Sequence, residues 1–286
     1  MSGPEAEEIG GRNRGETMEN IIDKLNRDVR NAAATLSHQE ARYLVDLYYQ
    51  MQHNRIVSNN QQRILNESDE KEPHETIAFF GVQYEKVENE IKSVLKKYVE
   101  SQPIGRWMLS ITGIGPVIAA GMIANIDIKK CQTAGAIWKF AGLDPTVEWK
   151  KGQKRPWNAD FKTLCWKLGQ SFLKVQSNPN AFYSRLYLER KEYETEKNEK
   201  GDYAEQAKEK LEKFKIGKTT EAYKAYSIGK LPVQHIRARA LRWTVKIFLS
   251  HLFEVWYELD RGEKPPKPFA IAQLGHAHMI EAPNRP

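Results

Sequence analysis

The sequence predicts an all-α protein, and two observations support this class. Apolar residues recur at three- and four-residue steps through most of the chain, which is the spacing of a helix face. No series of segments shows the apolar–polar alternation between turn residues that is typical of strands. We therefore expect a helical N-terminal hairpin, a central helical domain with a charged helical insertion, and a long C-terminal helix.

The first hundred residues divide into a polar tail and a helical arm. Residues 1–18 are rich in Gly and Glu, and we expect them to be disordered. Residues 19–100 carry helical patterns on both sides of a charged linker, in which Pro73 acts as a breaker. Ser37 and Glu40 have the spacing of a capping box that opens a helix. We interpret residues 19–100 as a helical hairpin that braces the molecule or joins two copies.

Residues 101–259 are expected to form the central helical domain. Short helices are predicted on both sides of Thr112–Gly115, and further helices near Thr133–Phe140 and Phe161–Val175. Residues 144–159, rich in Lys, Trp and Pro, are expected to form a loop between the last two of these helices.

The last part of the chain contains an insertion, a long helix and a tail. Residues 187–229 are dense in Glu and Lys with few large apolar side chains, which indicates a solvated helical insertion. Leu231 and Pro232 begin a final helix that should run to about Leu259. Residues 260–286 are rich in proline and are expected to pack as an extended tail.

Positive charge is concentrated in one segment of the chain. The whole chain carries a net charge of +7 at pH 7. Residues 129–174 contain ten basic and three acidic residues, so this segment alone matches the excess of the whole chain. Such a concentration indicates a polyanionic partner more specifically than the total charge does.

The cysteines and the hydropathy limit the class of protein. Cys131 and Cys165 form no CxxC pair, so no disulfide framework is expected. No apolar run approaches the ~20 residues needed to span a bilayer, and the N-terminus lacks the apolar core of a secretory signal. We therefore expect a cytoplasmic protein without a membrane partner.

A glycine-containing turn is the strongest local motif, and its residues are Thr112, Gly113, Ile114 and Gly115. Two glycines around one apolar residue permit a tight turn between helices, because glycine accepts positive φ, and Ile114 should fill the space between them. The second helix then begins with backbone N–H groups that have no helical partner and attract phosphates. We predict that this turn binds the DNA backbone; an ordinary packing turn is the alternative.

A basic loop that contains two tryptophans follows the turn. Lys and Arg side chains neutralise phosphates and release counterions, which makes binding sensitive to salt. We interpret the charges as DNA contacts and the rings of Trp149 and Trp157 mainly as anchors of the loop, although such rings can also stack on bases. The predicted contacts are Lys150, Lys151, Lys154, Arg155 and, in the following helix, Lys162.

The last helix carries a third basic feature. Arg239, Arg242 and Lys246 are spaced to share one helix face, and Arg237 lies nearby. A second DNA-backbone contact and an ordinary solvated face are equally compatible with this spacing.

Metal ligands and catalytic groups are not apparent. His276 and His278 lie close together, but no carboxylate or thiolate cluster accompanies them, so we expect a structural role. No carboxylate pair stands on the strand scaffold that is typical of two-metal phosphoryl chemistry. We expect no cofactor and no metal site.

Several runs of the sequence resemble the C-terminal domain of the DEDD-type insertion-sequence transposases. This group is related to the pilin-gene invertase and to the bridge-RNA-guided recombinases. The resemblance covers roughly residues 104–190 and 230–258, with an insertion between them. It implies a helix-hairpin-helix domain that binds DNA in recombination. The runs are SITGIGPVIAAGMIANI, AGAIWKFAGLDP, KGQKRPWNADFKTLCWKLGQSFLKV, NPNAFYSRLYLERK and LPVQHIRARALRWTVKIFLSHLF.

Two catalytic features of that family have no counterpart in the sequence. Family members carry an N-terminal RNase-H-like domain with four acidic metal ligands, whereas residues 1–100 are helical and show no strand-borne carboxylates. Members also place a catalytic serine after the GLxP motif, where this chain has Lys150 and Lys151. Ser171 is the nearest downstream serine, and its helical context makes it a poor nucleophile. The resemblance therefore implies DNA binding but identifies no catalytic residue.

The leading hypothesis is a transposase-family protein of a mobile element that binds DNA backbones or junctions in recombination or transposition. RNA is a further candidate partner, and the N-terminal helices are candidates for a homodimer contact. Two alternatives stay open: an active transposase or recombinase with an unorthodox nucleophile, and a helical scaffold that binds no DNA.

Overall fold

The computed structural model describes residues 24–67, 75–266 and 280–285. All regular structure in these ranges is helical, which confirms the predicted all-α class. The polar tail at residues 1–18 and the breaker Pro73 lie outside the described residues.

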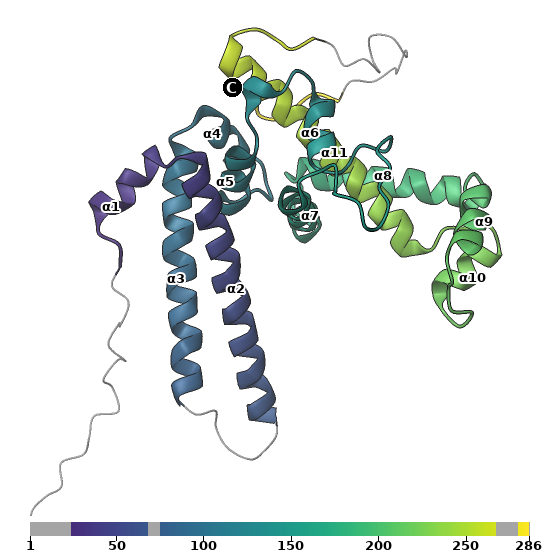
Figure 1. Cartoon of the computed structure of the whole chain (residues 1–286), viewed down its shortest axis with the longest axis horizontal. Helices are drawn as coiled ribbons and strands as arrows, with labels where there is room; N and C mark the ends of the chain where they lie inside the picture. The colour runs from purple at the N-terminus through teal and green to yellow at the C-terminus, as the bar shows by residue number, and fades with distance from the viewer. Residues whose placement is uncertain (1–23, 68–74, 267–279, 286) are drawn as a thin grey trace, which may run out of the picture.

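Two long helices form the predicted N-terminal hairpin. They are α2 (His38–Glu67) and α3 (Glu75–Glu100), which lie side by side and project from the rest of the molecule (Figure 1). A short helix, α1 (Arg27–Ala32), and a 3-10 helix, η1 (Ala33–Thr35), precede them.

The base of the hairpin is packed into the body of the protein. The predicted capping box is present, because the Ser37 N–H donates to the Glu40 carboxylate at 2.8 Å and the Glu40 N–H donates to the Ser37 hydroxyl at 3.2 Å. Beside it Ala41, Val45 and Leu95 are buried in the main core. The hairpin is therefore fixed at this end.

The turn-containing part of the chain packs against the base of the hairpin. It comprises α4 (Pro103–Leu109) and α5 (Pro116–Asn125), and α5 contacts α2, α3 and α7 (Ala159–Lys174). Close approach depends on small residues: a Cβ on Gly121 would lie only 2.7 Å from a methyl group of Leu164. The small-residue run of α5 thus positions α7 against the core.

The remaining core elements are a 3-10 helix and three α-helices. They are η2 (Ile128–Lys130), α6 (Ala134–Phe140), α8 (Phe182–Glu199) and α11 (Val233–Arg261). An aromatic cluster of Phe172, Tyr183 and Phe248 joins α7, α8 and α11. The ring centroids of Phe172 and Tyr183 are 4.9 Å apart.

The charged insertion is an extension of α8 followed by two short helices. These are α9 (Ala204–Lys213) and α10 (Glu221–Ser227). Because α8 begins at Phe182 and continues through residue 187 without a break, no structural boundary occurs where the sequence composition changes. This continuity was not predicted, because the sequence composition changes near residue 187 whereas the helix continues through it.

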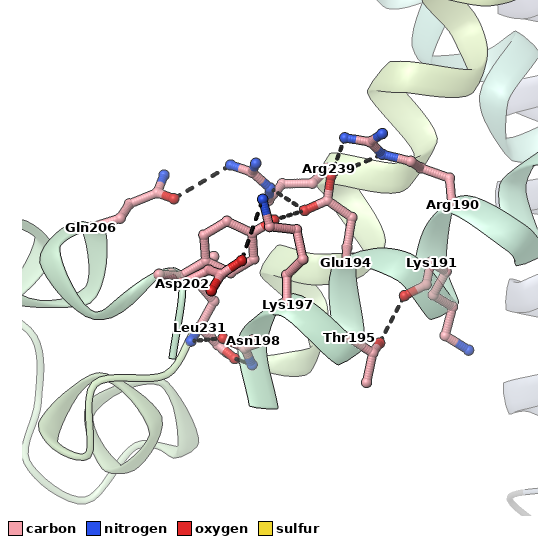
Figure 2. A network of polar contacts seen from close by, with 11 residues as sticks. Arg190, Lys191, Glu194, Thr195, Lys197, Asn198, Asp202, Gln206, Leu231 and Arg239 are labelled. Atoms are coloured by element: carbon pink, nitrogen blue, oxygen red, sulfur yellow. Dashed lines mark hydrogen bonds and ion pairs between the residues drawn. The ribbon is translucent and has the colours of Figure 1, made fainter. Parts of the chain in front are cut away.

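A buried carboxylate ties the insertion to α11 (Figure 2). The Glu194 side chain accepts hydrogen bonds from Arg190 at 2.6 and 2.9 Å, from Arg239 at 2.9 Å, and from the Tyr203 hydroxyl. Burial raises the pKa of Glu194, but hydrogen bonds from Tyr203, Arg239 and Arg190 outweigh this effect and keep the pKa below its usual value. The carboxylate therefore holds three elements together as an anion.

Asn198 makes a second connection between the insertion and α11. Its amide donates to the Leu231 carbonyl at 3.0 Å and its carbonyl oxygen accepts from the Leu231 N–H at 2.8 Å (Figure 2). This pair of bonds fixes the backbone just before α11 begins.

Residues 280–285 return to the core beside α4 and α11. The Trp107 indole N–H donates to the Pro283 carbonyl at 2.9 Å. His251 Nε2 lies 2.8 Å from the Ile280 carbonyl, so it must carry the proton, and Nδ1 then accepts from the Tyr183 hydroxyl at 2.9 Å.

Candidate nucleic-acid interface

Residues 110–115 form the turn between α4 and α5. Gly113 has a φ of 99°, a conformation that favours glycine, whereas Gly115 has a φ of −97° that any residue can adopt. Ile114 is 6% exposed and fills the core between the helices, as predicted. The turn therefore requires glycine at position 113, where φ is positive, but not at position 115.

One side of the turn is covered by protein. The Ser171 hydroxyl donates to the Gly113 carbonyl at 2.5 Å, and a Cβ on Gly113 would lie 3.1 Å from a methyl group of Val175. The Asn284 amide donates to the Ser110 carbonyl at 3.0 Å. This side therefore faces the end of α7 and the C-terminal segment.

The start of α5 is open. Gly115 is exposed, and a Cβ placed there would meet nothing within 4 Å. Fewer bare amides are present than predicted, because Pro116 has no N–H and the Ile114 N–H donates to the Ile111 carbonyl at 3.0 Å. Thr112 is half-buried beside this opening.

Tryptophans fold the basic loop, residues 144–158, back on itself. The rings of Trp149 and Trp157 meet edge to face with centroids 5.9 Å apart, and the Trp149 indole N–H donates to the Gln153 carbonyl at 2.8 Å. The Arg155 guanidinium lies 5.7 Å from the centroid of the Trp149 ring. The rings thus anchor the loop. Three exposed lysines with no ion pair among the described residues are Lys150, Lys151 and Lys154.

Lys162 of α7 lies close to cations of both the basic loop and α11. Its ammonium group lies 4.2 Å from the centroid of the Trp157 ring. Partial burial lowers the pKa of Lys162, and the nearby charges of Arg155 and Arg242 lower it further. None of these three cations has an ion-pair partner in the described ranges. The charge of Glu194 acts on Arg242 without forming an ion pair. Cations gathered without ion-pair partners are a suitable site for an anion.

Lys246 lies beside the same loop. Its ammonium group is 4.2 Å from the centroid of the Trp138 ring, and the Trp138 indole N–H donates to the Lys246 carbonyl at 3.1 Å. Hydrogen bonds from Thr146 lower the pKa of Asp144, and the charges of Lys246 and Lys139 add to this lowering. Lys246 therefore has an acidic neighbour, unlike Lys162.

Arg237 and Arg239 of α11 have different surroundings. Arg239 is bound to the buried Glu194, and its guanidinium also donates to Gln206 at 3.3 Å. Arg237 is exposed near Tyr187 of α8. Burial raises the pKa of Tyr187, and the charge of Arg237 partly offsets that rise. Arg239 is therefore committed to an internal ion pair.

The basic residues gather at one end of α7 and the glycine turn lies at the other. The basic loop leads into Ala159, whereas the turn contacts Ser171, and these residues are about 18 Å apart along the helix axis. We use the name basic surface for the cations at the first end, which are Lys150, Lys151, Lys154, Arg155, Lys162, Arg242 and Lys246.

One exposed aromatic residue was missed in the sequence. Trp166 of α7 is 61% exposed, the highest value among the seven tryptophans. Its position four residues after Lys162 places it on the polar side of α7, and this spacing is the signal in the sequence that identifies it as exposed.

The described residues contain no cluster of the usual metal ligands. Within these ranges no three His, Cys, Asp or Glu side chains are grouped so that they could hold a metal ion. His276 and His278 lie outside the ranges. The hydroxyl of Ser171 is engaged with the Gly113 carbonyl. None of the helices in the described part combines the length and apolar character that a bilayer span requires.

Comparison with known proteins gives one match. No curated protein and no solved structure matches the chain. A model of the Transposase IS116/IS110/IS902 family matches residues 105–155, which run from α4 through the glycine turn into the basic loop. Over this segment the chain is similar to the IS116/IS110/IS902 transposases, and the match confirms the predicted resemblance to insertion-sequence transposases.

Proposed function

We propose that this protein binds DNA through the basic surface and acts in the cytoplasm in the recombination or transposition of a mobile element. The observation that carries the proposal is the gathering of Arg155, Lys162 and Arg242 from three different elements without an ion pair to any of them in the described ranges. A folded protein tolerates such mutual repulsion readily where a polyanion relieves it. The similarity of residues 105–155 to a transposase family supports this partner.

The glycine turn supplies a second contact to the same DNA. The open backbone at Gly115 lets a phosphate approach the start of α5, with Thr112 beside it. The distance of about 18 Å between the two ends of α7 is roughly half of one turn of B-form DNA. One duplex is therefore long enough to reach both contacts.

The binding is expected to depend on DNA shape more than on sequence. Exposed lysines and arginines contact phosphates, which fix the position of a protein on DNA without reading its bases. Bent or branched DNA brings more phosphates within reach of one protein surface, so a four-way junction should bind more tightly than a linear duplex.

We also propose that two copies associate through the N-terminal hairpin. Its far half exposes large apolar side chains on both helices, and a second hairpin could cover them. These side chains are Ile56, Val57, Ile64, Phe80 and Val82.

Binding to a panel of duplex, single-stranded and four-way-junction DNA at matched salt tests the proposed function. The double variant Lys154→Ala with Arg155→Ala should weaken binding to every member about tenfold or more, because two phosphate contacts are lost. The matched control is Lys208→Ala with Lys215→Ala, which removes the same charge from exposed positions of the insertion. If both variants bind like the parent protein, the basic surface does not bind DNA.

A further inference from the structure

The ring of Trp166 is exposed without a partner. It is 61% exposed, and among the described residues it takes part in no ring stacking and no cation–ring contact. Trp149 and Trp157 differ, because their rings pack against each other and each ring also contacts a nearby cation. A loop anchor explains those two rings but does not explain Trp166.

Cations and polar side chains surround Trp166 on α7. Lys162 precedes it by one helical turn and belongs to the basic surface, while Gln170 follows by one turn. On the neighbouring rows of the helix, Thr163 and Lys167 line a cleft. The ring therefore lies between the basic surface on one side and this cleft on the other.

The cleft lies between α2 and α7 and has a volume of about 890 Å³. Its size suits a small molecule or a nucleobase with its sugar. Amide side chains give it both donors and acceptors, as the edges of nucleobases require. The amides are Gln50, Asn54, Asn125 and Asn158. Asn125 also donates to the Gly121 carbonyl at 2.9 Å, and Asn158 accepts from the Phe161 N–H at 2.8 Å, so these two amides are only partly available.

The charged groups of the cleft are balanced, in contrast to the basic surface. Arg42 and Lys167 are accompanied by Asp46 and Asp160. Burial raises the pKa of Asp46, and the charge of Asp160 raises it further, so the two carboxylates lie close enough to repel each other. A cleft of this kind favours a polar, uncharged group over a phosphate.

We propose that the exposed face of α7 binds a single-stranded polynucleotide, with one base stacked on Trp166 and a neighbouring base in the cleft between α2 and α7. Phosphates of the strand then lie against Lys162 and the rest of the basic surface. The inference rests on the proposed function, since the same cations serve both, but it adds a site for unpaired bases. Base stacking on aromatic rings is sequence-tolerant, because every base has a flat face.

The surroundings of Trp166 favour a nucleic acid over a protein partner. Docking surfaces for proteins have an apolar centre of several residues, whereas Lys162, Thr163 and Gln170 are the helical neighbours of this ring. A single ring beside cations matches the way single strands are bound.

Binding of the full-length protein to a single-stranded DNA, a single-stranded RNA of the same sequence and a matched DNA duplex tests this proposal. Trp166→Ala should weaken single-strand binding by about tenfold or more and change duplex binding less than about twofold. Trp166→Phe, which keeps a flat ring, should retain most of the affinity. A loss on DNA alone or on RNA alone identifies which strand uses the site.

Phe214→Ala is the matched control, because it removes a 54% exposed aromatic ring from the insertion. The inference is overturned if Trp166→Ala binds single strands like the parent, or if it loses single-strand and duplex binding equally. If the parent protein binds the duplex, the proposed function is retained even when one of these two results overturns the inference. Failure of the parent to bind any of the three nucleic acids removes the proposed function itself.

Discussion

The two glycines of the turn have different tasks, although they look equivalent in the sequence. Gly113 combines a φ of 99° with close contact to Val175, whereas Gly115 has an ordinary φ and open space around its Cβ position. The sequence predicted a tight turn and the burial of Ile114. It could not predict which glycine is free, because that depends on the end of α7, far away in the chain.

Alanine substitutions should separate the two tasks. Gly113→Ala should lower the free energy of unfolding by about 1–2 kcal/mol, because alanine is strained at positive φ. Gly115→Ala should leave stability almost unchanged and weaken DNA binding, because the methyl group obstructs the approach of a phosphate to the start of α5. Thermal unfolding and DNA binding of both variants check this. Unchanged DNA binding by Gly115→Ala would show that the turn is only a packing feature.

Glu194 is the buried carboxylate that connects the insertion to α11, beside the Asn198–Leu231 connection. Glu194→Gln removes the negative charge and leaves Arg190 and Arg239 facing each other without compensation. We expect the free energy of unfolding to fall by about 3 kcal/mol. Glu196→Gln, which alters an exposed contact to Lys200 on the same helix, should change it by less than about 0.5 kcal/mol. Equal denaturant midpoints for the two variants would contradict the assigned role.

At the level of helices, local sequence patterns located the elements well. Pro103, Pro116 and Pro232 mark helix starts, and the Ser37–Glu40 box forms as predicted. The start of α8 was not identified, because its first turns carry core aromatics and its last turns carry solvated charges. Helix continuity depends on the backbone, whereas the prediction followed composition.

The packing of α11 against the C-terminal segment should make stability depend on pH. Burial is the main cause that lowers the pKa of His251, to about 4, so the folded state disfavours the protonated ring. The unfolded chain takes up this proton near pH 6.5, so stability is full above that pH and falls as the pH decreases towards 4. The full loss is about 3 kcal/mol, from 1.36 kcal/mol per pKa unit.

Denaturant unfolding at pH 7 and pH 5 measures this effect. His235 also has a lowered pKa, mainly through burial, and contributes in the same direction. His251→Gln should therefore be less stable than the parent at pH 7 and show a smaller loss of stability between the two pH values. A variant with the same loss as the parent would exclude His251 as a source of the pH dependence.

Over the whole molecule, the candidate site combines residues from distant parts of the chain. The sequence identified the basic loop and the cations of α11 separately, but it could not place them side by side, because their proximity results from the packing of α6 and α7 on α11. For the same reason it did not show that Arg239 is used internally, or that the turn and the loop lie at opposite ends of α7.

The exposed far half of the N-terminal hairpin predicts a dimer. The double variant Ile64→Glu with Phe80→Glu places charges on both helices at positions that are already exposed, so the fold should be retained. Sedimentation equilibrium should find a dimer for the parent and a monomer for the variant. A monomeric parent protein at micromolar concentration would contradict this proposal.

The central claim is that the loop and α11 form one phosphate-binding surface, and the salt dependence of duplex binding tests it most directly. The slope of log K against log salt should fall by about one to two units for Lys154→Ala with Arg155→Ala, and by about the same for Arg242→Ala with Lys246→Ala. Slopes equal to that of the parent protein in both variants would show that these cations do not contact the DNA backbone.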